Sequence, residues 1–300
     1  MKIVLTGSLG NIGKPLTQEL VQKGHHVTVI TSKAERQKDI EALGAKAAIG
    51  SMTDADFLSA VFKGADIVYL METLGAVGGF FNKDIDFIDA ITKIGINYKR
   101  AVEQSGVKRV VHLSSIGAHM TEGNGILAFH HNVENILKQL PGDVSIKFIR
   151  PVGFYTNMFA FMRTIKTQGA IISNYGGDNK EPWVSPLDIA SVIAEEMEKP
   201  FAGRSVRYVA SDEISPAEIA KALGEAIGKP DLKWQTIPHK QLLNGMLEAG
   251  MNQQVAEGFV EMYTCQGSGI LYEDFYRNKP ALGKVKLSDF AKEFAAAYHG

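Results

Sequence analysis

The residues best suited to chemistry lie at the start of the chain, where glycines recur with the spacing G-x-x-G-x-x-G. They separate an apolar run from a segment with helical periodicity, which indicates a strand-to-helix turn. There Gly7 permits a tight bend, Gly10 lets the backbone approach a pyrophosphate, and Gly13 lets the helix pack on the strand. The N–H groups at the helix start favour phosphate. An ordinary glycine-rich turn is the alternative. The predicted dinucleotide-phosphate site consists of Gly7, Ser8, Leu9, Gly10, Asn11, Ile12 and Gly13.

The end of the second expected strand, residues 27–30, indicates which dinucleotide would bind. An NAD-binding protein usually places Asp or Glu there against the ribose hydroxyls. This chain instead has Ser32, Lys33 and Arg36, which supply a hydroxyl and two cations. Charge-assisted hydrogen bonds to a 2′-phosphate contribute roughly 1.5–3 kcal/mol each. We therefore predict that NADP is preferred over NAD. In the alternative interpretation the two cations simply face solvent at the start of an exposed helix.

Polar residues after the fifth expected strand predict the reactive end of the site. Ser114 and Ser115 end this strand, and they either hydrogen-bond the cofactor or substrate or form a strand-end turn. His130 stands at the start of a helix. It either binds the nicotinamide ribose, donates a proton, or makes its hydrogen bonds to other groups of the protein near the helix start. Glu134 lies one helical turn later on the same face and is expected to orient this imidazole.

Other strand ends predict further contacts, because the carboxyl ends of parallel strands meet at one edge of a sheet. The residues expected to flank the adenine and the inner ribose are Ser51, Met52, Leu70, Met71 and Glu72. Those expected to close over the nicotinamide are Pro151, Val152 and Phe154. A further set of apolar side chains has two interpretations. They either line a pocket for an aromatic or quinone-like acceptor or pack in the core. These side chains are Phe80, Phe81, Met120, Phe154, Tyr155, Met158, Phe159 and Trp183.

Strand-like and helix-like segments alternate through the first half of the chain, and this alternation positions the residues above. The expected strands are residues 3–5, 27–30, 47–49, 67–71, 110–113 and 144–149. The expected helices are residues 11–23, 34–43, 54–62, 84–105 and 130–140. Nearly continuous apolar strands joined by helices predict an α/β fold with a doubly wound parallel sheet of the Rossmann type. Its ligand would lie outside the carboxyl ends of the strands.

After Pro151 the alternation becomes irregular. Residues 1–152 are expected to form the NAD(P)-binding Rossmann domain, and residues 183–210 are expected to return to it. Residues 153–182 and 211–300 are expected to form a smaller, mainly helical lobe that binds the substrate. The elements expected after residue 182 are strands at 183–185, 204–209 and 232–237 and helices at 186–197, 216–227, 238–249, 255–263 and 288–298.

The composition of the 300 residues argues against several classes of protein. The 32 Lys and Arg residues balance 33 Asp and Glu residues, which favours neither nucleic acid nor a membrane surface as a partner. No apolar segment approaches the roughly 18 residues that span a bilayer, and the first apolar run is too short for a signal peptide. The single cysteine, Cys265, permits no internal disulfide. We expect a cytoplasmic protein without a metal site. His112, on a buried strand, is expected to be structural.

Several motifs in a fixed order resemble one family over residues 1 to about 230. They are GSLGNIG at 7–13, Ser114-Ser115, HHNVENILK at 130–138, Phe148-Ile149-Arg150-Pro151, Phe154, Asn157, and WVSPLDIA at 183–190. Together they are similar to the NmrA-like group of atypical short-chain dehydrogenases/reductases. The resemblance implies an NADP-binding domain with a smaller C-terminal lobe. Members include NADPH-dependent quinone reductases and proteins that bind the cofactor but act as redox-sensing regulators.

One departure from ordinary short-chain reductases bears on the chemistry. Those enzymes carry Tyr-x-x-x-Lys, in which the tyrosine protonates the carbonyl and the lysine holds the nicotinamide ribose. No such motif follows Ser115, and His130 stands where many relatives have the lysine. Our first hypothesis is an NADPH-dependent reductase of a small quinone-like or carbonyl acceptor, with water or His130 as the proton source. The second is a non-catalytic NADP-binding regulator, and a third, weaker one is a sugar-nucleotide epimerase relative.

Overall fold

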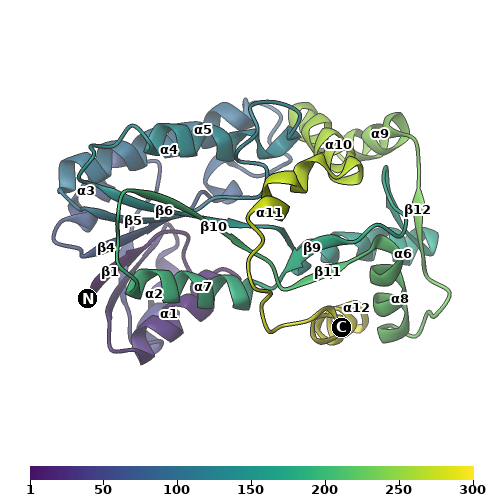
Figure 1. Ribbon diagram of the computed structural model, residues 1–300, viewed down its shortest axis with the longest axis horizontal. Coiled ribbons are helices and arrows are strands. Elements are labelled where there is room, and N and C mark those ends of the chain that lie inside the picture. Colours follow the sequence, from purple (N-terminus) through teal and green to yellow (C-terminus); the bar gives the residue numbers. More distant parts are fainter.

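The computed structural model describes all residues from 1 to 300, and its larger part is built on a parallel sheet (Figure 1). The strand order is β10-β6-β5-β4-β1-β2-β3, and every pair of neighbours is parallel. The strands are β1 (Lys2–Leu5), β2 (His26–Thr31), β3 (Lys46–Ile49), β4 (Ile67–Leu70), β5 (Arg109–Leu113), β6 (Ser145–Pro151) and β10 (Arg204–Val209). The predicted doubly wound parallel sheet is therefore confirmed.

Helices cover both faces of this sheet (Figure 1). One face carries α1 (Gly13–Gln22), α2 (Gln37–Ala42) and α7 (Pro186–Glu198). The other carries α3 (Ala55–Phe62), α4 (Phe87–Ser105) and α5 (Ala128–Leu137). Each face has its own apolar core, with 29 buried residues on the α1–α7 side and 24 on the α4–α5 side. The sheet is thus buried on both faces, as its uninterrupted apolar strands require.

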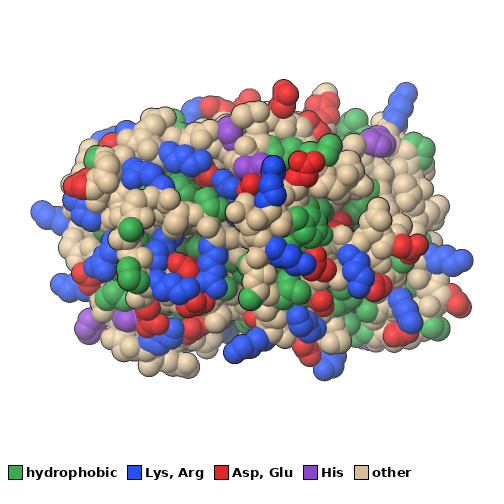
Figure 2. All heavy atoms as spheres, in the orientation of Figure 1, with side chains coloured by type: hydrophobic (Ala, Val, Ile, Leu, Met, Phe, Trp, Pro, Cys, Tyr) green, Lys and Arg blue, Asp and Glu red, His purple; other side chains and the backbone are tan.

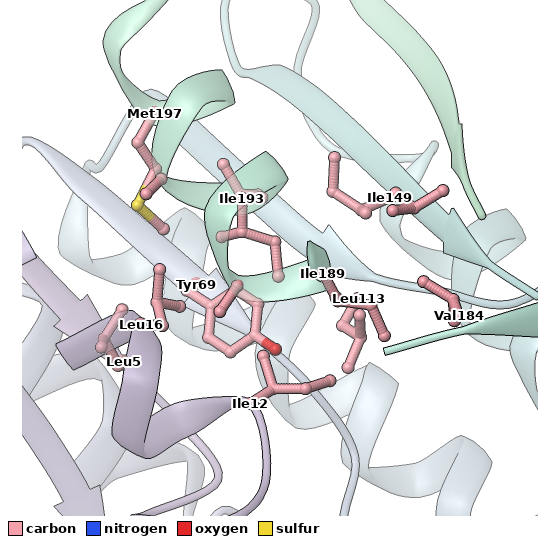
Figure 3. Close-up of a cluster of buried hydrophobic side chains, with 14 of the residues drawn as sticks. Leu5, Ile12, Leu16, Tyr69, Leu113, Ile149, Val184, Ile189, Ile193 and Met197 are labelled. Atoms are coloured by element: carbon pink, nitrogen blue, oxygen red, sulfur yellow. The ribbon is translucent and has the colours of Figure 1, made fainter. Parts of the chain in front are cut away.

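The packing of α7 shows how the second half of the chain returns to the sheet. Ile189, Ile193 and Met197 recur at helical spacing and point from α7 toward Leu16 of α1 (Figure 3). Full burial of a side chain of this size contributes roughly 1.5–3 kcal/mol. The strand after α7 is β10, which pairs with β6 at the edge of the sheet.

The strand order reverses at β1, which pairs with β2 on one side and β4 on the other. Thr6, directly after β1, links the ends of β1 and β4. Its Oγ1 accepts a hydrogen bond of 2.9 Å from the backbone N–H of Met71, which directly follows β4. Open α/β sheets bind ligands in the crevice outside such a reversal. The glycine turn follows β1 at this point.

The C-terminal lobe combines two small sheets with six helices and several short 3₁₀ segments. One sheet consists of β7 (Gly153–Phe154), β9 (Glu181–Val184) and β11 (Asp212–Ile214), and the other of β8 (Ala170–Ser173) and β12 (Lys233–Thr236). The helices are α6 (Met162–Gln168), α8 (Pro216–Ala226), α9 (His239–Glu248), α10 (Gln253–Ser268), α11 (Glu273–Arg277) and α12 (Leu287–His299). The 3₁₀ segments of the whole chain are η1 (Ala34–Arg36), η2 (Leu74–Val77), η3 (Gly125–Leu127), η4 (Tyr155–Phe161) and η5 (Ile270–Tyr272).

Some element boundaries differ from the sequence-based expectation. The first helix begins at Gly13 rather than residue 11, and α5 begins at Ala128 and ends at Leu137, three residues before the expected end. The expectation missed β7, β8, β11, α6 and α11, since all of them are short and depend on packing against residues distant in sequence. None of the helices is both long and apolar enough to cross a bilayer. Figure 2 shows acidic and basic side chains intermixed on the face it displays.

Candidate functional site

The glycine turn has a backbone that side chains would disrupt. Gly7 has a φ of 89°, and a Cβ there would overlap the Sδ of Met71. A Cβ on Gly13 would overlap the carbonyl oxygen of Ser8. Ser8 has a φ of 59° and is the only residue other than glycine with a positive φ, a strained conformation typical of functional turns. Gly10 differs, because the nearest atom to its Cβ would be a carbonyl oxygen 3.9 Å away. The turn is therefore tight at its two ends and open in the middle.

The start of α1 offers unused hydrogen-bond donors beside this opening. No side chain caps the helix, and its first turn contains no acidic residue. The backbone N–H groups of Asn11 and Ile12 donate to no protein acceptor. Uncapped N–H groups and the positive end of the helix dipole together favour a phosphate. These features fit a pyrophosphate placed over Gly10, and Leu9 packs beside them against the core.

The residues predicted to bind a 2′-phosphate stand at the end of β2. Ser32, Lys33 and Arg36 are all exposed. Thr31 organises the segment, since its Oγ1 accepts hydrogen bonds from the Ser8 hydroxyl at 3.1 Å and from the backbone N–H of Lys33 at 3.2 Å. Arg36 lies 3.7 Å from Asp39 in a surface ion pair that contributes little. Both cations are therefore accessible next to the glycine turn.

The side chains predicted to flank the adenine mostly point into the protein. Leu70 is fully buried, and Met52 is buried with its Sδ 3.6 Å from the hydroxyl of Tyr98. The carboxylate of Glu72 lies 3.1 Å from Nε2 of His112, and both side chains are almost completely inaccessible to solvent. The structural role expected for His112 is consistent with this pair.

Two of the predicted adenine contacts remain at the surface of the crevice. Ser51 is half-buried, and its hydroxyl shares a hydrogen bond of 2.7 Å with that of Thr53. Met71 is half-buried over Gly7. At the edge predicted to contact the adenine, Ser51 and Met71 are therefore accessible, while Met52, Leu70 and Glu72 lie behind them inside the protein.

The end of β5 is held by a buried charged network. Ser114 donates from its hydroxyl to Oε1 of Glu134 at 2.6 Å. Arg150, at the end of β6, donates to both oxygens of this carboxylate, from Nε at 2.8 Å and from Nη2 at 2.7 Å. Burial alone would raise the pKa of Glu134, but the bonds and charge of Arg150, with Ser114, lower it to about 2. Glu134 is therefore ionised and fixes β5, α5 and β6 to one another.

The same network continues into the C-terminal lobe. Nη1 of Arg150 donates to the hydroxyl of Tyr208 at 3.2 Å, and that hydroxyl donates to Oδ2 of Asp274 at 2.6 Å. Asp274 belongs to α11, and Tyr208 to β10. One chain of hydrogen bonds thus joins the ends of β5 and β6 to a helix of the lobe. Sequence reasoning gave Arg150, Tyr208 and Asp274 no role, although Arg150 was a visible signal as a charged residue inside the apolar run before Pro151.

Ser115 and His130 are the predicted reactive residues with unused polar groups. Ser115 is half-buried, and its hydroxyl has no hydrogen-bond partner in the protein. His130 is half-buried, and its Nδ1 is buried without a partner. Burial lowers the pKa of His130 to about 4, so the imidazole is neutral near pH 7. The expectation that Glu134 orients His130 is wrong, because Glu134 bonds to Ser114, Lys138 and Arg150 instead.

The segment expected to cover the nicotinamide is firmly anchored. Pro151 and Val152 are buried, with the carbonyl of Pro151 accepting from Ile116 at 2.8 Å and the N–H of Val152 donating to Val209 at 3.1 Å. Phe154 follows and is half-buried. This segment forms a fixed wall at the end of β6.

Most side chains considered for an aromatic pocket are core or surface residues. Tyr155, Met158 and Trp183 are buried in the core of the C-terminal lobe, where Phe159 also packs against Phe290. Phe80 packs between Phe87 and Phe259, whereas Phe81 is 60% exposed. Met120 and Phe154 are half-buried against the core on the α1–α7 face of the sheet, and Phe80 is half-buried against the core on the other face. The core interpretation therefore holds for most of this set. No group of three or more His, Cys, Asp or Glu side chains is arranged to hold a metal ion.

Comparisons with known proteins agree with this architecture. The NmrA-like family matches residues 1–291. An NAD(P)H azoreductase from Xenophilus azovorans is 22% identical over 299 residues, which cover 99% of both chains. An NADPH-dependent quinone oxidoreductase from Escherichia coli, solved with NADPH, has a TM-score of 0.80 against this chain at 17% identity, with 97% of this chain and 99% of that chain covered. The negative transcriptional regulator NmrA, solved with NADP, has a TM-score of 0.70 at 14% identity, covering 98% and 91%.

Proposed function

This chain belongs to the NmrA-like family, and from that premise we propose that it is an NADPH-dependent reductase of a small quinone-like or carbonyl acceptor. One observation carries the proposal. An open glycine turn with unused N–H donors lies at the strand reversal, and the unpartnered polar groups of Ser115 and His130 follow on the same edge of the sheet. The similar azoreductase and quinone oxidoreductase support a small, flat acceptor.

In this proposal the first half of the edge binds the cofactor. The N–H groups of Asn11 and Ile12 bind the pyrophosphate over Gly10, where no side chain intervenes. Lys33 and Arg36 bind the 2′-phosphate, which makes NADP the preferred dinucleotide. Ser51 and Met71 border the adenine and the inner ribose. When bound, NADPH supplies the hydride.

The second half of the edge orients the reacting groups. The hydroxyl of Ser115 and the neutral imidazole of His130 hydrogen-bond the nicotinamide ribose or the acceptor. Because His130 is uncharged near pH 7, it acts as a hydrogen-bonding group and water supplies the proton. Ser114 acts through Glu134 as a positioning residue. Pro151, Val152 and Phe154 exclude water from one side of the site.

The cofactor assignment is tested by titrating NADPH and NADH into the purified protein by calorimetry. Gly10→Ala should weaken NADPH binding by about tenfold or more while leaving the melting temperature unchanged, because its Cβ meets only open space until the phosphates arrive. Gly142→Ala is the matched control, since a Cβ there also contacts nothing and lies outside the site. The Lys33→Ala, Arg36→Ala double variant should lose the NADPH preference. A parent protein with no preference for NADPH over NADH contradicts the assignment.

The reductase assignment is tested by following NADPH oxidation with quinones, azo compounds, aldehydes and enones. We expect turnover with at least one class and a fall of about tenfold or more in kcat for Ser115→Ala or His130→Ala, with NADPH binding retained. The observation that favours a second function is the absence of a tyrosine acid, which the neutral His130 does not replace. Tight NADPH binding with no turnover on any acceptor would support a non-catalytic redox-sensing regulator, a function that the similar NmrA structure also suggests.

A further inference from the structure

A groove of about 610 Å³ is lined by α9 and α10 of the C-terminal lobe and by the loop that follows β5 of the large sheet. The loop contributes Met120, Glu122 and Gly123, and α9 contributes His239 and Leu243. None of its lining residues is among those proposed to bind NADPH. The groove is therefore separate from the proposed cofactor edge, and it shares only Met120 with the side chains considered for an acceptor pocket.

One face of α10 forms the longest wall of this groove. The residues that line it are spaced by three and four positions, as a single helical face requires, and they are Glu257, Val260, Glu261, Thr264, Cys265 and Ser268. Cys265 is only 8% exposed and lies at the floor, whereas Glu257 and Glu261 are exposed. The wall thus combines an apolar base with carboxylates at its rim.

The charge of the lining has one sign. Glu122, Glu257 and Glu261 line the groove together with no Lys or Arg. None of the three takes part in an ion pair, and Glu257 accepts only a hydrogen bond from Gln253 at 2.9 Å. Glu257 and Glu261 are one turn apart on α10, a spacing at which like charges destabilise a helix. A cation bound between them would relieve this repulsion.

The remaining lining is mainly apolar. Leu243 and Val260 are half-buried in the walls, and Ile270 is 51% exposed at one end. His239 is hydrogen-bonded through Nδ1 to the hydroxyl of Thr264 at 3.1 Å, so one of its two ring nitrogens is already occupied. A ligand that matches the apolar lining and the three carboxylates has an apolar body and a positive charge. A molecule of the same shape with a negative charge would be repelled.

We propose that this groove binds an organic cation whose charge is carried on an aromatic or aliphatic body. The apolar base takes the body, and Glu122, Glu257 and Glu261 take the charge. The site is independent of NADPH, because it shares no residue with the proposed cofactor edge.

Tetraphenylphosphonium and tetraphenylborate test the proposal, since they have nearly the same shape and opposite charge. Isothermal titration of the full chain should give tetraphenylphosphonium a Kd at least about tenfold lower, because a single carboxylate at contact distance in water is worth roughly fivefold in affinity. The preference should decrease as the salt concentration rises. Equal affinities, or tighter binding of tetraphenylborate, would overturn the proposal.

Variants of α10 locate the site. Glu257→Gln with Glu261→Gln should remove most of the preference for the phosphonium ion, while Glu248→Gln, an exposed carboxylate of α9 outside the lining, should not. Circular dichroism should show unchanged folding for both. Phosphonium binding that survives the double variant unchanged places the site elsewhere and contradicts the proposal. NADPH titrations of the same samples separate this result from the reductase proposal, since neither variant should alter NADPH affinity.

Discussion

Two buried carboxylates, one in each part of the molecule, respond to burial in opposite ways. Glu134, on α5 of the large sheet, is held by Arg150 and Ser114, and these partners lower its pKa to about 2 against the effect of burial. Glu181, on β9 of the C-terminal lobe, has no cation beside it. It accepts hydrogen bonds from Tyr175, Trp183 and Gln266, at 3.2, 3.0 and 3.0 Å. Burial raises the pKa of Glu181 to about 7.

The difference lies in the partners, since both side chains are almost inaccessible to solvent. The three neutral hydrogen-bond donors around Glu181 do not replace the hydration that its carboxylate loses on burial. The bidentate guanidinium of Arg150 does replace it for Glu134. The sheet is therefore held by a charge that stays fixed over the physiological range. The lobe instead contains a carboxyl that changes its protonation near neutral pH. Four single variants and one double variant test this contrast.

The largest effect is expected from Arg150→Met, which leaves Glu134 buried without its main partner. Removing one member of a buried pair costs about 3–5 kcal/mol. In the parent, Glu134 contributes stability that is present above about pH 4.5 and is lost as the pH falls toward 2. In the variant its pKa should rise, so stability should increase as the pH falls from neutral toward about 5. Urea denaturation across this range measures both effects.

The double variant Glu134→Met, Arg150→Met is the control for this prediction. Replacing both members of a buried pair with apolar side chains is often close to neutral. It should recover most of the stability lost in Arg150→Met and have no pH dependence from this site. A double variant that is no more stable than Arg150→Met would show that shape rather than charge holds this part of the sheet.

The second effect is expected from Glu181→Gln and depends on pH. The folded pKa of Glu181, about 7, lies above its ordinary value of 4.5, so the folded parent retains the proton between these values and loses stability as the pH rises through them. The variant lacks this loss. It should match the parent near pH 4 and exceed its stability by up to about 3 kcal/mol near pH 8. Gln266 can flip its side-chain amide so that its oxygen accepts a hydrogen bond from the side-chain NH₂ that the substitution introduces at position 181.

Thermal melts of both proteins at several pH values measure this difference. Leu or Ala at position 181 would leave the donors of Tyr175, Trp183 and Gln266 unpaired, so the amide is the informative substitution. A constant difference in stability between pH 4 and 8 would mean that Glu181 does not titrate in this range.

A smaller effect is expected from Tyr208→Phe, which removes the hydroxyl between Arg150 and Asp274. The loss of a buried hydrogen bond costs about 1 kcal/mol, and the two ions remain 3.5 Å apart. Hydrogen exchange should become faster in α11 but not in α5, because Glu134 keeps its bonds to Arg150. Faster exchange in both helices would indicate that the network is a single cooperative unit.

The smallest effect is expected from Lys138→Ala. Its ammonium lies 3.0 Å from Glu134, but its side chain is 41% exposed. Lys138 directly follows α5, one helical turn after Glu134. Exposed pairs of this kind contribute about 0.3–0.5 kcal/mol. Urea denaturation should therefore place Lys138→Ala close to the parent. A loss comparable to that of Arg150→Met would mean that the exposed cation, rather than the buried one, holds Glu134.

The large sheet and the glycine turn were predictable from sequence because their signals are local. An apolar run identifies a buried strand, and Gly7, Gly10 and Gly13 act through the backbone of their own turn. The partners of Glu134 were not predictable in this way. Helical spacing correctly places His130 and Glu134 one turn apart, but it does not show which strand lies opposite, and Arg150 of β6 lies there. The aromatic residues after Pro151 were similarly ambiguous, because pocket and core have the same composition.

The sequence by itself determined the order of strands and helices in the first half of the chain, the position of the glycine turn and the absence of a carboxylate after β2. These depend on residue type and spacing over a few positions. Only the tertiary structure decided that Ser114 is held by Glu134 while Ser115 stays free, and that Glu134 is ionised while Glu181 titrates near neutral pH. The physical reason is that the energy of a buried polar group is set by what the fold places against it. For Glu134 those groups come from the ends of β5 and β6. For Glu181 they come from Tyr175 and Trp183 nearby in the chain and from Gln266 on the distant α10.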